Sequence, residues 1–279
     1  MEVLRTVAAL RQWSREERNG GHAIGLVPTM GALHAGHASL IRAAAACERV
    51  AVSIFVNPTQ FGPNEDYARY PRTFDADCAV AEAEGADIVF APTVEELYPA
   101  GATTFVEVEG LSHRLDGASR AGHFRGVATV VAKLLIASEA DRAYFGQKDA
   151  AQVAVVRRMV ADLRFRAEIV VCPIVREPDG LALSSRNLFL SAAERAQALV
   201  LSRAVRQAEA LAAAGERRSS ALIAATRRCF AAVPEVRVDY IACVDWATLD
   251  PVEIATPGTL FAVAAWVGQT RLIDNTILS

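Results

Sequence analysis

Two histidines three residues apart, His34 and His37, are the residues of this sequence best suited to chemistry. They end the stretch GLVPTMGALHAGH, in which an apolar strand pattern at 23–27 stops at Pro28 and a helical pattern starts after a glycine turn. The first amides of a helix lack partners and carry partial positive charge, so this arrangement favours phosphate binding. Side chains three residues apart share a helix face, where imidazole N–H groups can donate to phosphate oxygens as negative charge develops.

The glycine between the two histidines strengthens this interpretation. Gly36 has no Cβ, which leaves room for a nucleotide to lie against the backbone. The resulting HxGH pattern differs from the GxxxxGK(S/T) and GxGxxG phosphate-binding patterns, and neither of those occurs at this turn. A tight turn with a hydrogen-bonded core histidine remains the alternative.

Short apolar strand patterns alternate with helical patterns through the first part of the chain. The strand patterns cover residues 23–27, 50–56, 87–90, 143–145 and 169–171, and the helical patterns cover residues 37–47, 74–84, 127–137 and 150–163. This alternation predicts an α/β fold with a Rossmann-like, doubly wound parallel sheet. Ligands of such sheets bind beyond the carboxyl ends of the strands.

Polar loops follow three of these strands. The HxGH loop follows the strand at 23–27, Asn57–Phe61 follows the strand that ends at Val56, and Gly146–Asp149 follows Tyr144 and Phe145. Because parallel strands end at the same edge of a sheet, we expect these loops to converge there.

The pattern changes after about residue 179, which predicts two domains, 1–178 and 179–279. A long alanine-rich helix is expected from Ser191 to Ala214, capped by Ser191 with Glu194 three residues on, and a second helix from Ser220 to Ala232. Strands are expected at 236–244, 260–267 and 270–273. The second part is therefore predicted to be a smaller α+β domain.

Two further segments carry groups that suit phosphate. Lys148 lies in a strand-end loop, where a lysine can neutralise a phosphate oxygen. Ser184, Ser185 and Arg186 follow a glycine-led loop, and their hydroxyls and guanidinium suit a mobile phosphate clamp. The alternatives are a surface lysine and a cluster of loop hydrogen bonds.

The remaining polar candidates are less specific. Gln60 and Gln152 offer neutral amides that fit a substrate with hydroxyls and a carboxylate, or that stabilise loops. Arg125 stands near a helix start, and Asp77 is a weak candidate for a magnesium ligand on an otherwise solvated helix face. Because no Ser-His-Asp or Cys-His arrangement stands out as a nucleophile, the site favours attack on a phosphate by the substrate's own oxygen.

Composition narrows the class of protein. The chain has 279 residues, is 52% hydrophobic and carries a net charge of −3, which does not favour a nucleic-acid or membrane-surface protein. The 5 cysteines form no CxxC pair and no zinc-type spacing, so reduced thiols in the cytoplasm are expected. The charged N-terminus does not resemble a signal peptide, and the apolar stretch 260–267 is too short to span a membrane.

Together these motifs resemble the pantothenate synthetase (pantoate–β-alanine ligase) family of the HxGH nucleotidyltransferase-like superfamily. The resemblance runs over nearly the whole chain and is carried, in order, by VPTMGALHAGH, VSIFVNPTQF, RYPRTFDAD, GHFRGVATVVAKL, YFGQKD, VREPDGLALSSRN and RLIDN.

The resemblance implies an AMP-forming ligase of pantothenate biosynthesis, on the coenzyme A pathway. Pantoate would attack the α-phosphorus of ATP to give pantoyl adenylate and pyrophosphate, and the amine of β-alanine would then displace AMP. It also implies Mg2+ with ATP as co-substrate, no organic cofactor, a cytoplasmic homodimer, and a C-terminal domain that acts as a lid over a nucleotide- and pantoate-binding domain.

The resemblance also assigns roles to residues. His37, His34, Lys148 and Arg186 would be catalytic, and Gln60 and Gln152 would bind pantoate, with Gln60 also touching β-alanine. ATP would contact Met30, Gly31, Ala32, Leu33, His34, Ala35, Gly36, His37, Gly146, Gln147, Lys148, Asp149, Val175, Leu183, Ser184, Ser185 and Arg186.

The sequence departs from the family pattern at four places. Leu183, Ala121 and Ala151 stand where the family commonly has methionine, proline and glutamine, and Ala76-Asp77 stands where some members have two aspartates. The last departure puts a protein-held magnesium site in doubt. Another HxGH-type nucleotidyltransferase and a non-catalytic nucleotide-binding regulator remain the alternative functions, with a tRNA-charging enzyme disfavoured by the acidic charge balance.

Overall fold

The structure is a computed structural model that describes residues 1–63 and 66–279. The chain forms two compact units, the N-terminal unit (Met1–Gly146 and Val155–Cys172) and the C-terminal unit (Gln147–Ala154 and Pro173–Ser279). The sequence predicted a boundary at 178/179, whereas these units part at 172/173 and the second also includes 147–154. What each part of the chain does stays a prediction.

The N-terminal unit is built on a six-stranded sheet with the order β1-β4-β3-β2-β5-β6, and all its paired strands are parallel. The strands are β1 (Glu2–Leu4), β2 (Ile24–Thr29), β3 (Arg49–Ile54), β4 (Ile88–Phe90), β5 (Arg142–Gly146) and β6 (Glu168–Cys172). This confirms the predicted Rossmann-like sheet. The short strand β1 was not predicted, because three residues carry too little pattern.

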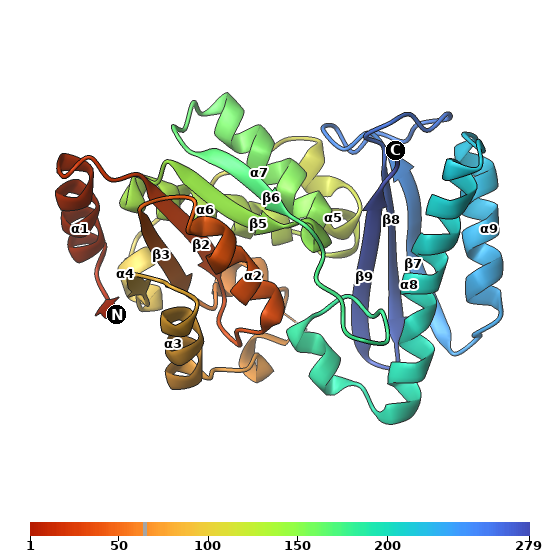
Figure 1. Ribbon diagram of the computed structural model, residues 1–279, viewed down its shortest axis with the longest axis horizontal. Helices are drawn as coiled ribbons and strands as arrows, with labels where there is room; N and C mark the ends of the chain where they lie inside the picture. The colour runs from red at the N-terminus through yellow and green to blue at the C-terminus, as the bar shows by residue number, and fades with distance from the viewer. Residues whose placement is uncertain (64–65) are drawn as a thin grey trace. The chain divides into compact units, whose positions relative to one another are not determined.

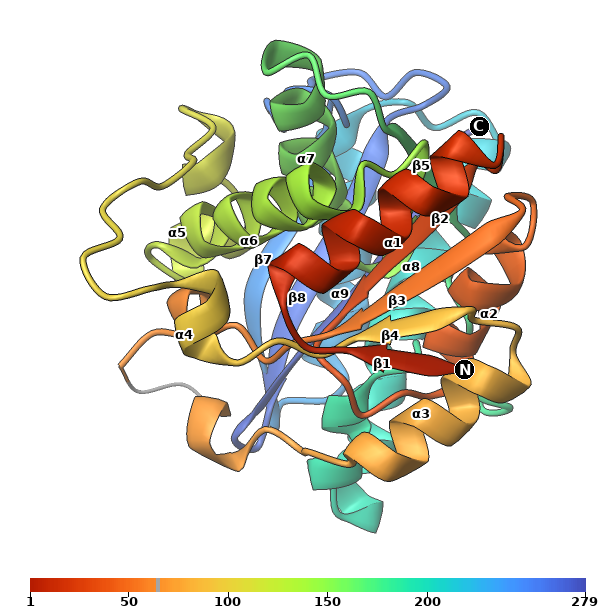
Figure 2. The same ribbon diagram turned by 90° about the vertical axis from the view of Figure 1, so that its left-hand side faces the viewer.

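Helices cover both faces of this sheet. The helices in this part of the chain are α1 (Val7–Asn19), α2 (Ala35–Ala44), α3 (Phe74–Ala83), α4 (Val94–Leu97), α5 (Asp116–Ser119), α6 (His123–Ser138) and α7 (Ala150–Asp162), of which residues 150–154 belong to the C-terminal unit. Figure 2 shows α1 and α6 together on one side of the sheet and α2 and α3 on the other. Apolar side chains of α2, such as Ile41, pack with Val27 and Val52 of the sheet and form the core on that side.

Strand β2 lies at the point where the strand order reverses. It pairs with β3 on one side and β5 on the other, and the chain passes from β2 to β3 through α2. A loop at the carboxyl end of such a strand lies where doubly wound sheets bind ligands. The loop after β2 carries the HxGH motif, as the sequence predicted.

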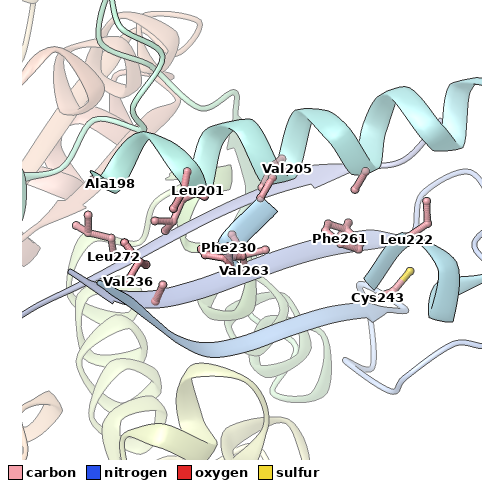
Figure 3. Packing of buried hydrophobic residues seen from close by; sticks show 14 of the residues in the cluster. Ala198, Leu201, Val205, Leu222, Phe230, Val236, Cys243, Phe261, Val263 and Leu272 are labelled. Carbon is pink, nitrogen blue, oxygen red and sulfur yellow. The ribbon is translucent and has the colours of Figure 1, made fainter. Parts of the chain in front are cut away.

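The C-terminal unit contains an antiparallel sheet, β7 (Val236–Val244), β8 (Leu260–Val267) and β9 (Thr270–Ile277), with α8 (Ala192–Ala213) and α9 (Ser219–Ala231) (Figure 1). In Figure 3 side chains of α8, such as Leu201, point toward the strands, where Val263 and Leu272 complete a buried cluster. The predicted capping box of Ser191 and Glu194 at the start of α8 is confirmed.

The predicted end of the last strand at residue 273 is wrong, since β9 continues to Ile277. The strand passes through two buried polar residues, Asp274 and Asn275, whose side chains are satisfied by distant partners. Among the helices that the structure describes, none is both long enough and apolar enough to cross a membrane.

Candidate active site

The two histidines of the HxGH motif lie at the start of α2, and the ring of each accepts a hydrogen bond from a backbone amide of the motif. His34 is the N-cap residue, and its Nδ1 accepts a hydrogen bond from the Gly36 amide at 3.1 Å. The His37 Nδ1 accepts from the His34 amide at 3.3 Å, and the two rings lie with centroids 4.1 Å apart and their planes tilted by 32°. Because both Nδ1 atoms accept, each neutral ring carries its hydrogen on Nε2. The helix start therefore presents two Nε2–H donors beside its own amides.

The turn before these histidines is held by a buried carboxylate. Gly31 and Ala32 have φ angles of 83° and 51°, so two consecutive residues adopt the left-handed region. The Asp77 carboxylate, on α3 and 2% exposed, accepts from the Ala32 amide at 3.0 Å and from the Leu33 amide at 2.7 Å. A side chain on Gly31 would meet Asp77 Oδ2 at 2.9 Å, so glycine also permits this close approach.

Asp77 was the candidate magnesium ligand. Its Oδ1 also accepts from Thr73 Oγ1 at 3.1 Å, so the carboxylate already receives three hydrogen bonds. Within residues 1–63 and 66–279, no group of three or more His, Cys, Asp or Glu side chains could hold a metal ion. In the described geometry Asp77 anchors the loop of the HxGH motif, and its role toward a metal stays a prediction.

The loop after β3 orients Gln60 through a chain of hydrogen bonds. Tyr98 donates from its hydroxyl to Asn57 Oδ1 at 3.0 Å, and Asn57 Nδ2 donates to Gln60 Oε1 at 3.1 Å. Gln60 Nε2 in turn lies 2.9 Å from the Met30 sulfur, in the loop after β2. Burial raises the pKa of Tyr98, with opposing hydrogen bonds to Thr59 and Asn57, so its hydroxyl stays protonated and keeps donating.

His123 at the start of α6 fixes the backbone of the same loop. Its Nδ1 lies 2.8 Å from the Gln60 carbonyl oxygen, and its Nε2 lies 2.9 Å from Arg120 Nη1. A carbonyl only accepts and a guanidinium only donates, so the ring is neutral with its hydrogen on Nδ1. Gly126 lets α6 pack against this loop, because a Cβ there would lie 2.3 Å from the Thr59 carbonyl oxygen.

Asn57, Tyr98 and His123 were not assigned roles from the sequence. Asn57 and His123 lie in the motifs NPTQF and GHFRG. Their positions beside predicted site residues were the signal in the sequence that could have pointed to them. Tyr98 comes from a separate segment and gave no signal. Arg125, a possible anion ligand in the sequence, stacks on Phe105 with its guanidinium carbon 3.8 Å from the ring centroid.

In the C-terminal unit, Lys148 lies in a 3-10 turn (Gln147–Asp149) whose backbone is bound by β9. Asn275 Nδ2 donates to the carbonyl oxygens of Gln147 at 3.0 Å and Lys148 at 2.9 Å. The Lys148 side chain is 21% exposed, and its Nζ lies 3.5 Å from Asp149 Oδ1. Gln152 is half-buried in the first turn of α7.

The segment that carries the predicted phosphate clamp is a hairpin in the same unit. The Leu183 amide donates to the Val175 carbonyl at 2.9 Å, which places these two predicted ATP contacts opposite each other. Ser184 then caps a 3-10 turn (Ser185–Phe189) by accepting from the Arg186 amide at 3.3 Å. All of Val175, Leu183, Ser184, Ser185 and Arg186 are half-buried.

An arginine on α8 ties the same hairpin down. Arg195 donates to Glu177 Oε2 at 2.6 Å and to Asp179 Oδ2 at 2.7 Å. The Arg195 hydrogen bonds hold the pKa of Glu177 below its ordinary value, against the effect of burial. The Leu181 amide and Arg195 likewise lower the pKa of Asp179. The clamp segment is thus bounded by ionised carboxylates at neutral pH.

The geometry brings the predicted residues together in separate groups. The N-terminal unit joins His34 with His37 and Met30 with Gln60. The C-terminal unit joins Val175 with Leu183 and holds the backbone of Lys148 through Asn275. One group presents paired imidazoles and helix amides, and the other presents a lysine and a serine–arginine turn; both suit a substrate that carries phosphate.

Comparisons with known proteins agree with this chemistry. The family model described as Pantoate-beta-alanine ligase matches residues 2–277. The chain is similar to the pantothenate synthetase of Acidobacterium capsulatum, with 62% identity over 100% of this chain and 97% of the relative. It is also similar to that of Koribacter versatilis, with 56% identity over 100% of this chain and 96% of the relative.

Solved structures show the same fold. The pantothenate synthetase of Thermus thermophilus is 47% identical, covers 99% of each chain and has a TM-score of 0.94. The pantoate–β-alanine ligase of Francisella tularensis, described as complexed with β,γ-ATP and β-alanine, is 33% identical, with a TM-score of 0.81 over 99% of this chain and 97% of that one. The motifs, the fold and these relatives agree over the full length, and the chain belongs to the pantoate–β-alanine ligase family.

Proposed function

We propose that this ligase joins pantoate to β-alanine in two steps driven by ATP. The pantoate carboxylate attacks the α-phosphorus of ATP, which forms pantoyl adenylate and releases pyrophosphate. The β-alanine amine then attacks the acyl carbon, the C–N bond forms, and AMP leaves. The structure of the Francisella tularensis relative in complex with β,γ-ATP and β-alanine supports both co-substrates.

The observation that carries the proposal is the pair of imidazoles at the start of α2. Both rings accept at Nδ1 from backbone amides, so each neutral ring carries its hydrogen on Nε2 at a helix start. During attack at phosphorus, negative charge builds on the phosphate oxygens, and fixed donors stabilise it without reorganising. We assign His37 the catalytic role and His34 the neighbouring one, with Met30–His37 lining the ATP site.

Gln60 orients the two substrates that react with each other. Its Oε1 is engaged by Asn57 and its Nε2 faces the Met30 sulfur, a weak acceptor that a substrate oxygen can replace. The amide can therefore donate to the pantoate carboxylate or a hydroxyl and still keep its orientation. We propose that Gln60 contacts pantoate and β-alanine and that Gln152 contacts pantoate.

Lys148 and the turn at 184–186 supply positive charge and hydrogen-bond donors to the phosphates. Lys148 acts as a compact point charge, whereas the planar guanidinium of Arg186 can bind two phosphate oxygens at once. We propose that the remaining contacts to ATP come from Gly146, Gln147 and Asp149, from Val175 at the adenine, and from Leu183, Ser184 and Ser185 on the phosphate side.

Mg2+ enters with ATP, since this ion commonly binds substrate phosphates with few protein ligands. We further propose that the enzyme is a homodimer, that it acts in the cytoplasm, and that residues 179–279 act as a lid domain toward a nucleotide- and pantoate-binding part at 1–178. The absence of CxxC pairs among the 5 cysteines supports a reducing compartment.

The exchange of labelled pyrophosphate into ATP tests this function. The proposal expects exchange that requires pantoate and Mg2+ and does not require β-alanine, because the adenylate forms before the amine reacts. Exchange that needs β-alanine, or that proceeds without pantoate, would refute the two-step route.

A further inference from the structure

Two adjacent buried polar residues interrupt the apolar pattern of β9. Asp274 and Asn275 are 2% and 3% exposed. Burying such groups costs free energy unless hydrogen bonds satisfy them, so their presence in a strand calls for partners. They belong to the RLIDN motif, to which the proposed chemistry assigns no role.

The Asn275 carboxamide is fully engaged with one segment of chain. Its Nδ2 donates to the Gln147 carbonyl at 3.0 Å and to the Lys148 carbonyl at 2.9 Å, and its Oδ1 accepts from Gln147 Nε2 at 3.2 Å. The two carbonyl oxygens need two N–H donors and the Gln147 side chain needs an acceptor, and a carboxamide provides both kinds of group. A carboxylate of the same size provides no donor at all.

These bonds fix the backbone from which the Lys148 side chain extends. The turn Gln147–Asp149 follows β5 directly and leads into α7. Trp246 Nε1 donates to the Ala150 carbonyl at 3.0 Å, so the residue that follows the turn is also held. With the carbonyls of residues 147, 148 and 150 bound, the Lys148 Cα has little freedom to shift.

The residue before Asn275 on β9, Asp274, fixes the position of the strand at this point. Asp274 binds Arg176 through both carboxylate oxygens, at 2.7 and 2.9 Å. Its Oδ1 also accepts from the backbone amide of Asn275 at 2.8 Å. Arg176 also donates to the Gly180 carbonyl at 3.1 Å. Because side chains alternate along a strand, Asp274 and Asn275 face opposite sides of β9.

We propose that Asn275 is a positioning residue that holds the Lys148 backbone, and with it the ammonium group, in the place where it neutralises the phosphates of ATP. The inference rests on the role proposed above for Lys148. Asn275 itself acts on the turn and needs no contact with substrate. An electrostatic contact is sensitive to small displacements, and a shift of about 1 Å can cost up to about 100-fold in rate.

The test compares Asn275→Asp with Thr276→Ala in the full-length enzyme. Asn275→Asp replaces the donating NH2 by an oxygen that faces two carbonyl oxygens, so the turn must move. We expect pyrophosphate exchange to slow by about 10- to 100-fold with the KM for pantoate unchanged. We also expect faster amide hydrogen exchange in the peptide that covers 147–150. Thr276→Ala alters the next residue of β9, whose hydroxyl contacts Glu209 at 3.4 Å, and should change neither readout.

A double-mutant cycle with Lys148→Ala separates positioning from a general loss of structure. If Asn275 acts through Lys148, adding Asn275→Asp to Lys148→Ala should slow exchange by less than about twofold more. Effects that multiply, or normal exchange in Asn275→Asp, would overturn the inference while leaving the role of Lys148 intact. Normal exchange in Lys148→Ala alone would instead overturn the proposed role of Lys148. If Asn275→Asp does not fold, Asn275→Ser is carried through the same cycle and decides by the same outcomes.

Discussion

The carboxylate of Asp77 offers a sharp test of how the HxGH loop is built. Asp77→Asn keeps the size of the side chain and replaces one oxygen by an NH2 group. The oxygen that remains can face the Leu33 amide and the Thr73 hydroxyl, at 2.7 and 3.1 Å from Oδ1 in the native structure. The new NH2 then faces the Ala32 amide, 3.0 Å from Oδ2, so a donor meets a donor.

The expected cost follows from these contacts. Hydrogen bonds to a charged group contribute about 1.5–3 kcal/mol each, against about 0.5–1.5 kcal/mol for neutral pairs. Losing one such bond and weakening two others should lower the free energy of unfolding by about 2–4 kcal/mol. Because Ala32 sits at a φ of 51° and lies two residues before His34, the loosened loop should also raise the KM for ATP.

Urea unfolding and pyrophosphate exchange measure the two effects, with Asp75→Asn as the matched control. Asp75 is exposed in the first turn of the same helix, so its substitution removes the same charge without touching the loop. If Asp77 anchors the loop, the Mg2+ concentration needed for half-maximal rate should not change. A raised Mg2+ requirement with normal stability would make Asp77 a metal ligand, and equal behaviour of both variants would refute the anchoring role.

Three further changes test the histidine pair, the packing against the Gln60 loop and the ion pair of Arg195 with Glu177. His37→Ala should slow adenylate formation by about 10²–10³-fold while the protein stays folded. The control is His113→Ala, because His113 is exposed and pairs with Glu107, and this variant should keep the normal rate. A His37→Ala variant that keeps the normal rate and has only a shifted melting temperature would show that His37 has a structural role. Gly126→Ala would place a Cβ 2.3 Å from the Thr59 carbonyl oxygen and 2.6 Å from the Gln60 backbone nitrogen. The clash should lower the free energy of unfolding by about 1–3 kcal/mol and, by shifting the Gln60 loop, raise the KM for pantoate. An unchanged KM for pantoate would argue against a contact between Gln60 and pantoate. Because hydrogen bonds from Arg195 lower the pKa of Glu177, the Glu177 carboxylate stabilises the fold at pH values above its unfolded pKa of about 4.3, and this contribution is lost as the pH falls through the lower folded pKa. The difference in unfolding free energy between wild type and Glu177→Gln should therefore be largest near neutral pH and should disappear in acid. A difference that does not depend on pH would contradict this ion pair's proposed contribution.

Local patterns were sufficient for most of the fold. The alternation of apolar strands and helices predicted the parallel sheet, and the serine and glutamate at 191 and 194 predicted the cap of α8. The histidine pair was placed correctly at the start of a helix, because its spacing and glycines are local signals. Helix α1 was missed because charged residues are spread along it and Leu10 and Ser14 are its only buried residues.

The supports of the site could not be predicted, because each depends on residues far apart in the chain. Asp77 and Asn275 look like solvated polar residues in their local sequence, and the predicted last strand stopped before Asp274. Each instead satisfies backbone groups of a remote loop, 44 and 45 residues away for Asp77 and 127 and 128 residues away for Asn275. Only the assembled fold shows which loop a buried polar side chain serves.

The fate of oxygen from the pantoate carboxylate distinguishes the adenylate route from its alternatives. Pantoate labelled with oxygen-18 in its carboxylate is turned over with ATP and β-alanine, and the products are separated for mass spectrometry. If the carboxylate attacks the α-phosphorus, AMP carries one labelled oxygen and the new amide carbonyl of pantothenate keeps the other. Label in pyrophosphate or inorganic phosphate, or AMP without label, would contradict the adenylate route.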